Sequence, residues 1–236
     1  MAIVSQHERC AKELRQCVNK EKALILQRFF KTGKGEYGEG DRFLGVIVPQ
    51  QRRIAQMYRE MPIGQVKKLL QSKVHEYRMT ALLILLYQFK KANEPERKKI
   101  FEFYCKNIQW INNWDLVDIT CRDIVGAYLF DTDRAVLYTL AQSKNVWERR
   151  IAMVSTWYFI SRKQYNDTLN IAKILLKDEH DLIHKAVGWM LREVGKRSLS
   201  TEEEFLKKYS CVMPRTMLRY AIERFPENKR KKYLTR

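Results

Sequence analysis

Four stretches of similar pattern decide the fold, because each reads as the opening of a helix of the same kind. They are Glu76–Leu86 (EYRMTALLILL), Asn112–Arg122 (NNWDLVDITCR), Glu148–Tyr158 (ERRIAMVSTWY) and Ile183–Glu193 (IHKAVGWMLRE). Equivalent places in them are held by Arg78, Trp114, Arg150 and Lys185, which follow one another at 36, 36 and 35 residues. Paired helices at a near-constant period indicate an α-solenoid, with units somewhat shorter than the roughly 40–47 residues of HEAT repeats.

Helical periodicity covers nearly the whole chain, and no alternating strand pattern exceeds a few residues. We therefore expect an all-α, HEAT-like or ARM-like solenoid of paired antiparallel helices, forming a single domain over residues 1–236 with a basic concave groove. The predicted helices are 8–30, 49–60 (opened by Pro49), 64–72, 75–91, 95–109, 113–129, 132–142, 147–162, 165–177, 181–197, 201–208 and 214–224. The basic tail, about 227–236, is expected to fray.

The charge balance favours a polyanionic partner. Lys and Arg number 45 against 27 acidic residues, which gives a formal net charge of +18. No run of residues approaches the length of a membrane span and no signal peptide is evident, so a cytoplasmic location is expected. Five scattered cysteines predict neither disulfides nor a zinc site, and the pair His180 and His184 lacks further ligands. No metal or other cofactor is expected.

A glycine-rich segment follows the first predicted helix. Residues 33–45 (GKGEYGEGDRFLG) hold five of the nine glycines and are predicted to form a loop. A nucleotide-binding P-loop is not indicated, because the G-x-x-x-x-G-K-[ST] pattern is absent and no strand precedes the segment.

The spacing of apolar residues separates buried from exposed positions in the helix predicted for 181–197. Its buried face is expected to contain Ile183, Val187, Met190, Leu191 and Val194. Trp189 points away from that face, and the nearby cations are Lys185, Arg192 and Lys196. Either Trp189 faces a ligand among these cations, or it packs against a neighbouring repeat.

Two neighbouring arginines in the helix predicted for 147–162 have different surroundings. The buried stripe contains Trp147, Ile151, Val154 and Tyr158. Arg149 points directly away from this stripe, which predicts a solvated charge. Arg150 lies at the edge of the stripe beside Trp157, which predicts a fixed position.

The helix predicted for 113–129 raises the most important alternatives. Trp114 falls within the buried stripe formed by Val117, Cys121, Ile124, Val125 and Tyr128, so it is either a core residue or a ring that reaches past the edge. Asp118 lies at the edge of the stripe. Periodicity does not distinguish a catalytic carboxylate at this place from an ordinary i,i+4 ion pair with Arg122.

The chain resembles the bacterial AlkD-type DNA alkylation repair glycosylases, which are built from HEAT-like repeats. Five stretches carry the resemblance, in order and over nearly the whole chain: FFKTGKGEYGEGDRFLGV (29–46), NWDLVD (113–118), VWERR (146–150), KAVGWMLREVGKR (185–197) and MPRTMLRYAIERF (213–225). The resemblance implies hydrolytic excision of N3- and N7-alkylated purines, of the 3-methyladenine and 7-methylguanine type, from double-stranded DNA. It also implies action without a base-flipping pocket.

The resemblance places the functional residues at Trp114, Asp118, Arg150 and Trp189. Asp118 would be the essential carboxylate, the two tryptophans would pack on the deoxyribose, and Arg150 would hold a phosphate. The N-terminal aromatic contact would be Phe29, Phe30 or Tyr37. The cations expected on DNA are Arg52, which resembles a backbone-contacting arginine of the family, and Arg78, Lys185, Arg192, Lys196, Arg215 and Arg219.

These expectations describe a monomeric, monofunctional glycosylase, since no lysine stands out as a Schiff-base nucleophile. A non-catalytic HEAT-like DNA-binding or scaffold protein is the alternative, and it would need the basic groove without the carboxylate. A solenoid that binds proteins would instead be expected to have an acidic or apolar concave face.

Overall fold

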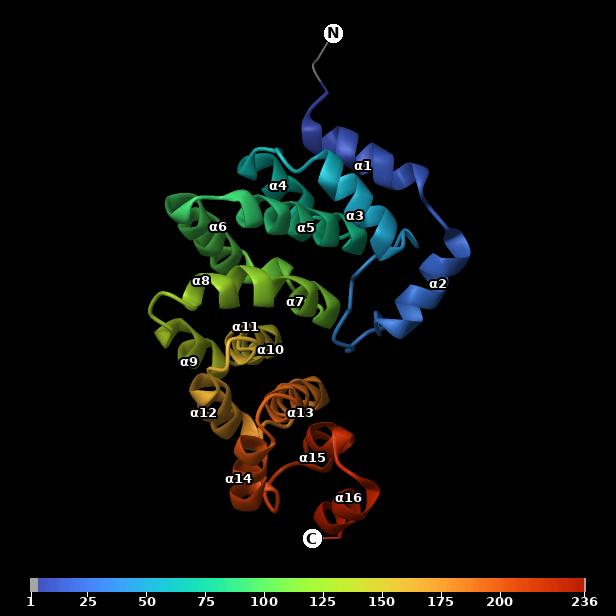
Figure 1. Ribbon diagram of the computed structural model, residues 1–236. Helices are drawn as coiled ribbons and strands as arrows, with labels where there is room; N and C mark the ends of the chain where they lie inside the picture. Colours follow the sequence, from blue (N-terminus) through green and yellow to red (C-terminus); the bar gives the residue numbers. More distant parts are fainter. Residues whose placement is uncertain (1–3, 236) are drawn as a thin grey trace. The chain divides into compact units, whose positions relative to one another are not determined.

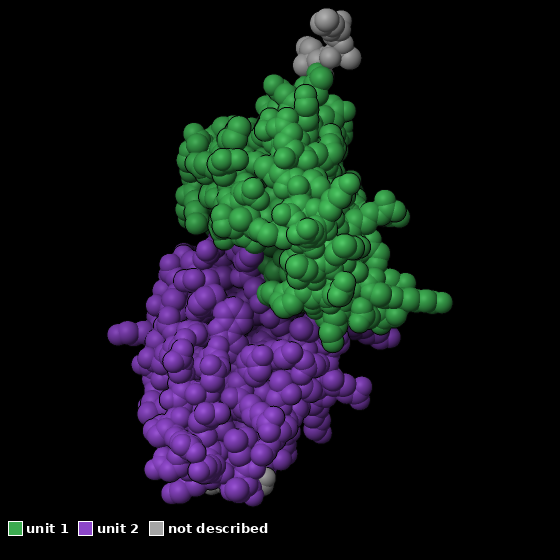
Figure 2. All heavy atoms as spheres, turned by 90° about the vertical axis from the view of Figure 1, so that its right-hand side faces the viewer, with its two compact units in different colours: residues 1–116 green, residues 117–236 purple. Residues whose placement is uncertain are grey.

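The protein is described by a computed structural model over residues 4–235, and within this range it consists of helices, loops and one isolated bridge between Arg42 and Val74 (Figure 1). The prediction of an all-α chain of paired helices is confirmed. The chain divides into two compact units at Leu116 and Val117, shown in separate colours in Figure 2. Each unit is described by itself.

The first unit is built around α5 (His75–Lys91). Its other helices are α1 (Gln6–Gln16), α2 (Lys20–Phe29), α3 (Val48–Met57), α4 (Ile63–Leu70) and α6 (Glu94–Lys106), and α7 (Trp114–Cys121) begins in it. The run from Met79 to Leu86 is buried on every side, because α5 packs against α3, α4 and α6. A helix that is apolar all round is stable only when neighbours cover it in this way. The bounds of α5 match the predicted 75–91.

The single helix predicted over 8–30 is wrong, because the chain breaks into α1 and α2 at residues 17–19. Asn19 ends the break: its side chain accepts a hydrogen bond from the Lys22 amide at 2.9 Å and so caps α2. The Asn19 amide donates to the Leu44 carbonyl at 2.9 Å. Gly45 permits this approach, since it has a φ of 80° and a Cβ there would meet the Asn19 carbonyl oxygen. The glycine-rich segment is a loop, as predicted.

The second unit is built around α13 (Asp181–Gly195), which packs against α10 (Val146–Ser155), α12 (Asn166–Ile174), α14 (Leu199–Tyr209) and α15 (Arg215–Ala221). The remaining helices are α8 (Ala127–Leu129), α9 (Ala135–Ala141), α11 (Trp157–Ile160) and α16 (Glu227–Leu234). Gly188 allows α13 and α15 to approach closely, because a Cβ there would lie closer than 3.0 Å to the Met217 carbonyl oxygen. The five residues predicted as the buried face of this helix are all buried.

Two predicted helices contain interruptions that the sequence pattern does not reveal. The helix predicted over 113–129 widens into a π-helical turn at Arg122–Gly126, between α7 and α8. The helix predicted over 147–162 breaks at Thr156, between α10 and α11. Tyr128 and Tyr158, both assigned to buried stripes, are only half-buried.

The basic C-terminal tail does not fray over its described residues but forms α16. Tyr233 is buried, and its ring meets that of Phe225 with 5.9 Å between the ring centroids. Arg215, at the start of α15, donates a hydrogen bond to the carbonyl of Leu234 at the end of α16. An apolar anchor and a cap at the last carbonyls therefore hold a helix whose own sequence is mostly charged.

Candidate functional site

Asp118 and Arg150 form a bidentate ion pair in the second unit. Nε of Arg150 donates to Oδ1 of Asp118 at 2.9 Å, and Nη2 donates to Oδ2 at 2.8 Å. Only 15% of the Asp118 side chain and 6% of the Arg150 side chain are exposed. Two parallel, charge-assisted hydrogen bonds in this environment fix the plane of the carboxylate.

Arg150 has a third partner, because its Nη1 donates to the carbonyl of Leu182 at the start of α13. The guanidinium therefore connects α10, α7 and α13 within the second unit. Arg150 is held in place, as its position beside the buried stripe predicts. All three nitrogens of the Arg150 guanidinium already donate to protein groups. The implied contact with a phosphate would therefore require Arg150 to release Asp118.

The alternative ion pair between Asp118 and Arg122 is not the arrangement observed. Nε of Arg122 instead lies 3.5 Å from Oδ1 of Asp123, and its guanidinium carbon lies 4.4 Å from the ring centroid of Trp157. A guanidinium over an indole face is a favourable cation–π geometry. The Arg122 guanidinium therefore lies over the Trp157 ring and does not pair with Asp118, which precedes it by one helical turn.

Trp157 connects this cation to Trp189. The two indole rings meet edge to face, with centroids 5.0 Å apart and an interplanar angle of 63°. Trp189 is half-buried, so its ring is covered in part by Trp157 of α11 and remains accessible in part. The sequence pattern places Trp157 beside Arg150 but does not predict that it lies between Arg122 and Trp189. The sequence feature that could have indicated this is that Trp157 lies outside the predicted buried stripe and beside Arg150, a predicted site residue.

The thiol of Cys121 lies near the ion pair. Cys121 is completely buried, and burial raises the pKa of its thiol far above the usual range, with a further increase from the Asp118 charge. A neutral, buried thiol is a poor nucleophile. We therefore assign Cys121 a packing role.

Trp114 belongs to an aromatic cluster in the first unit. Its ring stacks on Phe30 with centroids 5.2 Å apart and meets Phe29 edge to face at 5.9 Å. Phe30 and Phe43 both lie against the ring of His75, at 5.1 and 4.6 Å. Trp114 is half-buried, so the ring is partly covered and partly accessible. Of the three candidate N-terminal aromatics, Phe29 and Phe30 both contact Trp114.

His75 bridges two carboxylates beneath this cluster. Its Nε2 lies 2.9 Å from Oδ2 of Asp115, and its Nδ1 lies 3.2 Å from Oδ2 of Asp41. Burial alone would lower the pKa of His75, but the Asp115 charge and the hydrogen bonds to both carboxylates outweigh it and raise the pKa. The residue after Trp114 is thus tied to the start of α5.

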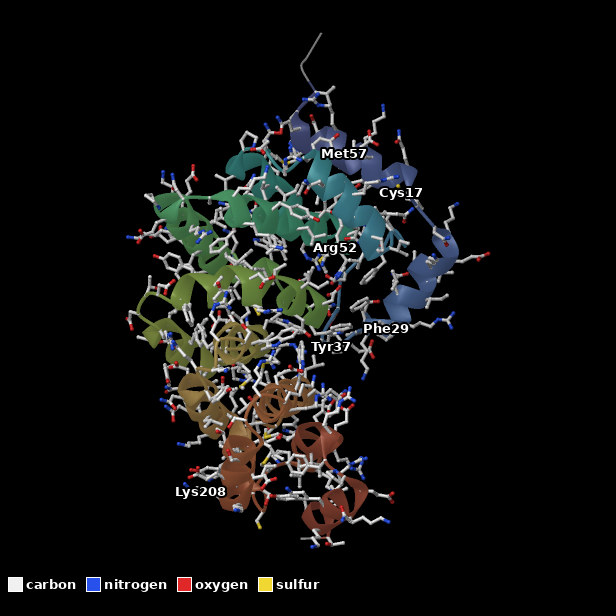
Figure 3. The ribbon with its side chains drawn as sticks, viewed as in Figure 1. Cys17, Phe29, Tyr37, Arg52, Met57 and Lys208 are labelled. Atoms are coloured by element: carbon white, nitrogen blue, oxygen red, sulfur yellow. The ribbon has the colours of Figure 1, made fainter. Side chains whose placement is uncertain are left out.

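The cations predicted to contact DNA have different surroundings. Arg78 is 2% exposed and pairs with Asp41 at 2.6 Å, so it is buried structure and we withdraw it as a DNA contact. Arg149, predicted as a solvated charge, instead pairs with Asp178 at 2.6 Å. The others are at or near the surface: Arg52 on α3 (Figure 3), Arg215 and Arg219 are exposed, Lys185 pairs with Asp181, Arg192 with Glu223, and Lys196 with Glu193.

His180 and His184 have structural partners. Nδ1 of His180 accepts a hydrogen bond from the Leu182 amide at 3.1 Å and so caps α13. Nε2 of His184 meets the carbonyl of Asp178. Among residues 4–235, no three His, Cys, Asp or Glu side chains are grouped so as to hold a metal ion. No helix in the same range is long and apolar enough to cross a membrane.

The fold and this pair together define a helical-repeat protein that carries a partly exposed carboxylate held by arginine. The chain belongs to the DNA alkylation repair enzyme family, which matches residues 10–225. Its structure is similar to that of a predicted DNA alkylation repair enzyme from Enterococcus faecalis, with a TM-score of 0.69 and 19% identity over 89% of this chain and 97% of that one. It is also similar to AlkD2 from Streptococcus mutans, with a TM-score of 0.56 and 16% identity over 88% and 99%.

No curated protein sequence matches the chain. At these identities the structural likeness supports the fold, while the family match supports a role in the repair of alkylated DNA. Helix α16 lies beyond the matched residues.

Proposed function

We propose that the protein is a monofunctional DNA glycosylase. It would hydrolyse the N-glycosidic bond of positively charged N3- and N7-alkylated purines in double-stranded DNA. Water would add to C1′ of the deoxyribose and release one proton to the solvent. The alkylated base would leave as a neutral molecule with the bonding electron pair, and an abasic site would remain. The observation that carries this proposal is the bidentate pair of Asp118 and Arg150 in a chain of the DNA alkylation repair family.

The chemistry requires only one carboxylate. An N3- or N7-alkylated purine already carries a positive charge, so the leaving group needs no proton from a general acid. The remaining task is to stabilise the oxocarbenium character that develops at C1′ and to position a water molecule. A carboxylate fixed in advance, in a site that largely excludes bulk water, is suited to this task.

Arg150 would be a positioning residue in this mechanism. Since its fork holds both oxygens of Asp118, it sets the direction in which the negative charge is presented. The implied phosphate contact is the other possibility. The two roles differ in salt dependence, because only a phosphate contact releases counterions.

The aromatic residues and surface cations would hold the DNA. Trp114 and Trp189, both half-buried, would pack on the deoxyribose, and Trp157 would support Trp189 from behind. The proposed backbone contacts are Arg52, Lys185, Arg192, Lys196, Arg215 and Arg219. The protein would act as a monomer without a cofactor.

The decisive experiment is release of 7-methylguanine from methylated duplex DNA by the Asp118→Asn variant. We expect excision to be lost while DNA affinity is retained. Asp167→Asn is the matched control, because Asp167 pairs with Arg134 at 2.7 Å and its side chain is 17% exposed, much as Asp118 is. Full activity of Asp118→Asn would reject the proposal, and an inactive wild type that still binds DNA would favour the non-catalytic alternative.

A further inference from the structure

Arg122 has hydrogen-bond donors that no residue in the described part of the chain uses. Its Nε is buried and lies 3.5 Å from Oδ1 of Asp123 without a hydrogen bond. Nη1 and Nη2 make no hydrogen bond to residues 4–235, and they remain accessible in a side chain that is 34% exposed. Asp123 is itself 35% exposed, and an ion pair of this length between exposed side chains is weak. The edge of the guanidinium formed by Nη1 and Nη2 is therefore open.

The Trp157 ring fixes the plane of this guanidinium. The guanidinium carbon lies 4.4 Å from the ring centroid, which is a close cation–π contact. Stacking covers one face of a guanidinium but leaves its N–H groups, which lie in the plane, free to donate at the edges. Trp157 in turn meets Trp189 edge to face, with 5.0 Å between the ring centroids. Arg122 is therefore held beside two tryptophans, of which Trp189 is proposed to pack on the deoxyribose.

Arg122 is also close to the proposed catalytic carboxylate. It follows Asp118 by four residues and directly follows α7, which is a regular α-helix through Cys121. Residues at this spacing lie on the same side of a helix, with Cβ atoms roughly 5–6 Å apart. Because the Asp118 carboxylate is held by Arg150, an ion pair within the helix does not occupy Arg122. The open edge of Arg122 thus belongs to the surroundings of the proposed site.

Arg150 lacks a comparable open edge. Its Nε and Nη2 donate to Asp118, and its Nη1 donates to the carbonyl of Leu182. A phosphate could bind Arg150 only after some of these bonds are broken, and the loss of the ion pair would leave a largely buried carboxylate without its bidentate partner. Arg122 can bind an anion without any such loss.

We propose that Arg122 binds a phosphodiester of the DNA backbone beside the lesion, with Nη1 and Nη2 donating to the phosphate oxygens. The planar fork of a guanidinium matches two oxygens of a phosphate, and such charge-assisted pairs are stronger than neutral hydrogen bonds. The cation–π contact with Trp157 orients the fork before DNA arrives, so less side-chain freedom is lost on binding. The phosphate contact that the family resemblance implies for Arg150 would then be made by Arg122.

The test measures binding of the full-length protein to a DNA duplex that contains one tetrahydrofuran residue, a stable analogue of an abasic site. Arg122→Gln removes the charge and should make the slope of log K against log salt shallower by about 0.9, which corresponds to about eightfold weaker binding at about 0.1 M salt. An unchanged slope would overturn the proposal, whether or not excision falls, because Arg122 would then only support Trp157.

Arg134→Gln is the matched control in the same unit. Arg134 also stacks on an aromatic ring, that of Phe159, with its guanidinium carbon 4.2 Å from the ring centroid. Its Nη atoms are occupied, however, because Nη1 donates to Asp167 and Nη2 donates to Gln164, each at 2.7 Å. The salt slope of Arg134→Gln should therefore equal that of the wild type. An equal decrease of the slope in both variants would overturn the proposal, since any lost positive charge would have the same effect.

Arg122→Lys keeps the charge but lacks the planar fork, and it keeps a cation over Trp157 for the fold. It should bind the duplex more tightly than Arg122→Gln and less tightly than the wild type. Binding no tighter than that of Arg122→Gln would also overturn the proposal. This inference rests on the proposed action on DNA, but none of these measurements requires base release. An inactive wild type would therefore reject the glycosylase reaction alone, and an unchanged salt slope would reject the role of Arg122 alone.

Discussion

Nε2 of His75 lies 2.9 Å from Oδ2 of Asp115, so the first turn of α7 is anchored to the first residue of α5. Both side chains are almost completely buried. The anchor directly follows Trp114 in the chain, which makes the protonation of His75 relevant to stability and to the placement of that indole.

Stability should therefore fall as His75 loses its proton. Its pKa is raised in the folded protein, so its contribution is fully present below the unfolded-state pKa of 6.5 and is lost as the pH rises through the folded pKa. The loss is about 1.4 kcal/mol for each unit by which the pKa is raised. Urea unfolding between about pH 6 and 9 should show a steeper decline in the wild type than in His75→Asn, in which only the other titrating groups, such as Glu202, still contribute. A decline of the same size in both proteins would rule out His75 as its source.

Glu202 on α14 should destabilise the protein at alkaline pH. Burial raises the pKa of its carboxyl to about 8, with a smaller contribution from Glu203, and its Oε1 lacks a partner among the described residues. The folded-state pKa is above the unfolded one, so the contribution is full below pH 4.5 and is lost as the pH rises to about 8. Glu202→Gln should raise the Tm at pH 9, while Glu204→Gln, a change at an exposed residue, should not. No difference between these variants would contradict the prediction.

Removing Arg150 should reduce excision without changing the salt dependence of DNA binding. Arg150→Ala removes the bidentate ion pair of the largely buried Asp118, and breaking such a pair costs roughly 3–5 kcal/mol of stability. If Arg150 positions Asp118, the slope of log K against log salt should equal that of the wild type. A slope shallower by about 0.9 would instead indicate that Arg150 contacts a phosphate. Filter binding at several salt concentrations distinguishes the two roles.

Tyr233→Ala should release α16 while the rest of the fold persists. The buried Tyr233 ring against Phe225 is the apolar anchor of a helix whose other residues are mostly charged or polar. Limited proteolysis should then cleave within residues 227–235, and the main thermal transition should change little. Lys232→Ala, at an exposed position on the same helix, is the control. Protection of the tail in Tyr233→Ala would show that the polar contacts of α16, which include those from Arg215 to Leu234 and from Lys229 to Glu203, are sufficient to hold it.

Sequence periodicity predicts the helices and their buried faces well, because the 3.6-residue repeat of apolar side chains is a local property. The match of α5 and the five buried residues of α13 illustrate this. The breaks at Asn19 and Thr156 and the widening after Cys121 are not predicted, since packing between helices decides them.

The ion-pair partners of charged residues are harder to predict from the sequence than the buried faces of helices. Periodicity places Arg149 in solvent and Asp118 at an edge, but it does not reveal Asp178 or Arg150 as their partners, each about 30 residues away along the chain. Arg78 is instructive: it occupies the same repeat position as Arg150, yet its partner Asp41 comes from the glycine-rich loop and buries it completely. Equivalent positions in a repeat thus acquire different roles from their neighbours.

The π-helical turn at Arg122–Gly126 directly follows α7 and changes the direction in which the next side chains point around the helix axis. Such a turn contains one more residue than an α-helical turn, and one residue corresponds to about 100° of rotation. Side chains after the turn are therefore rotated with respect to those before it. Deleting a single residue from this segment would restore regular helical phase and turn the following residues away from their present neighbours. The number of residues between α7 and α8 therefore determines which neighbours the side chains after the turn meet.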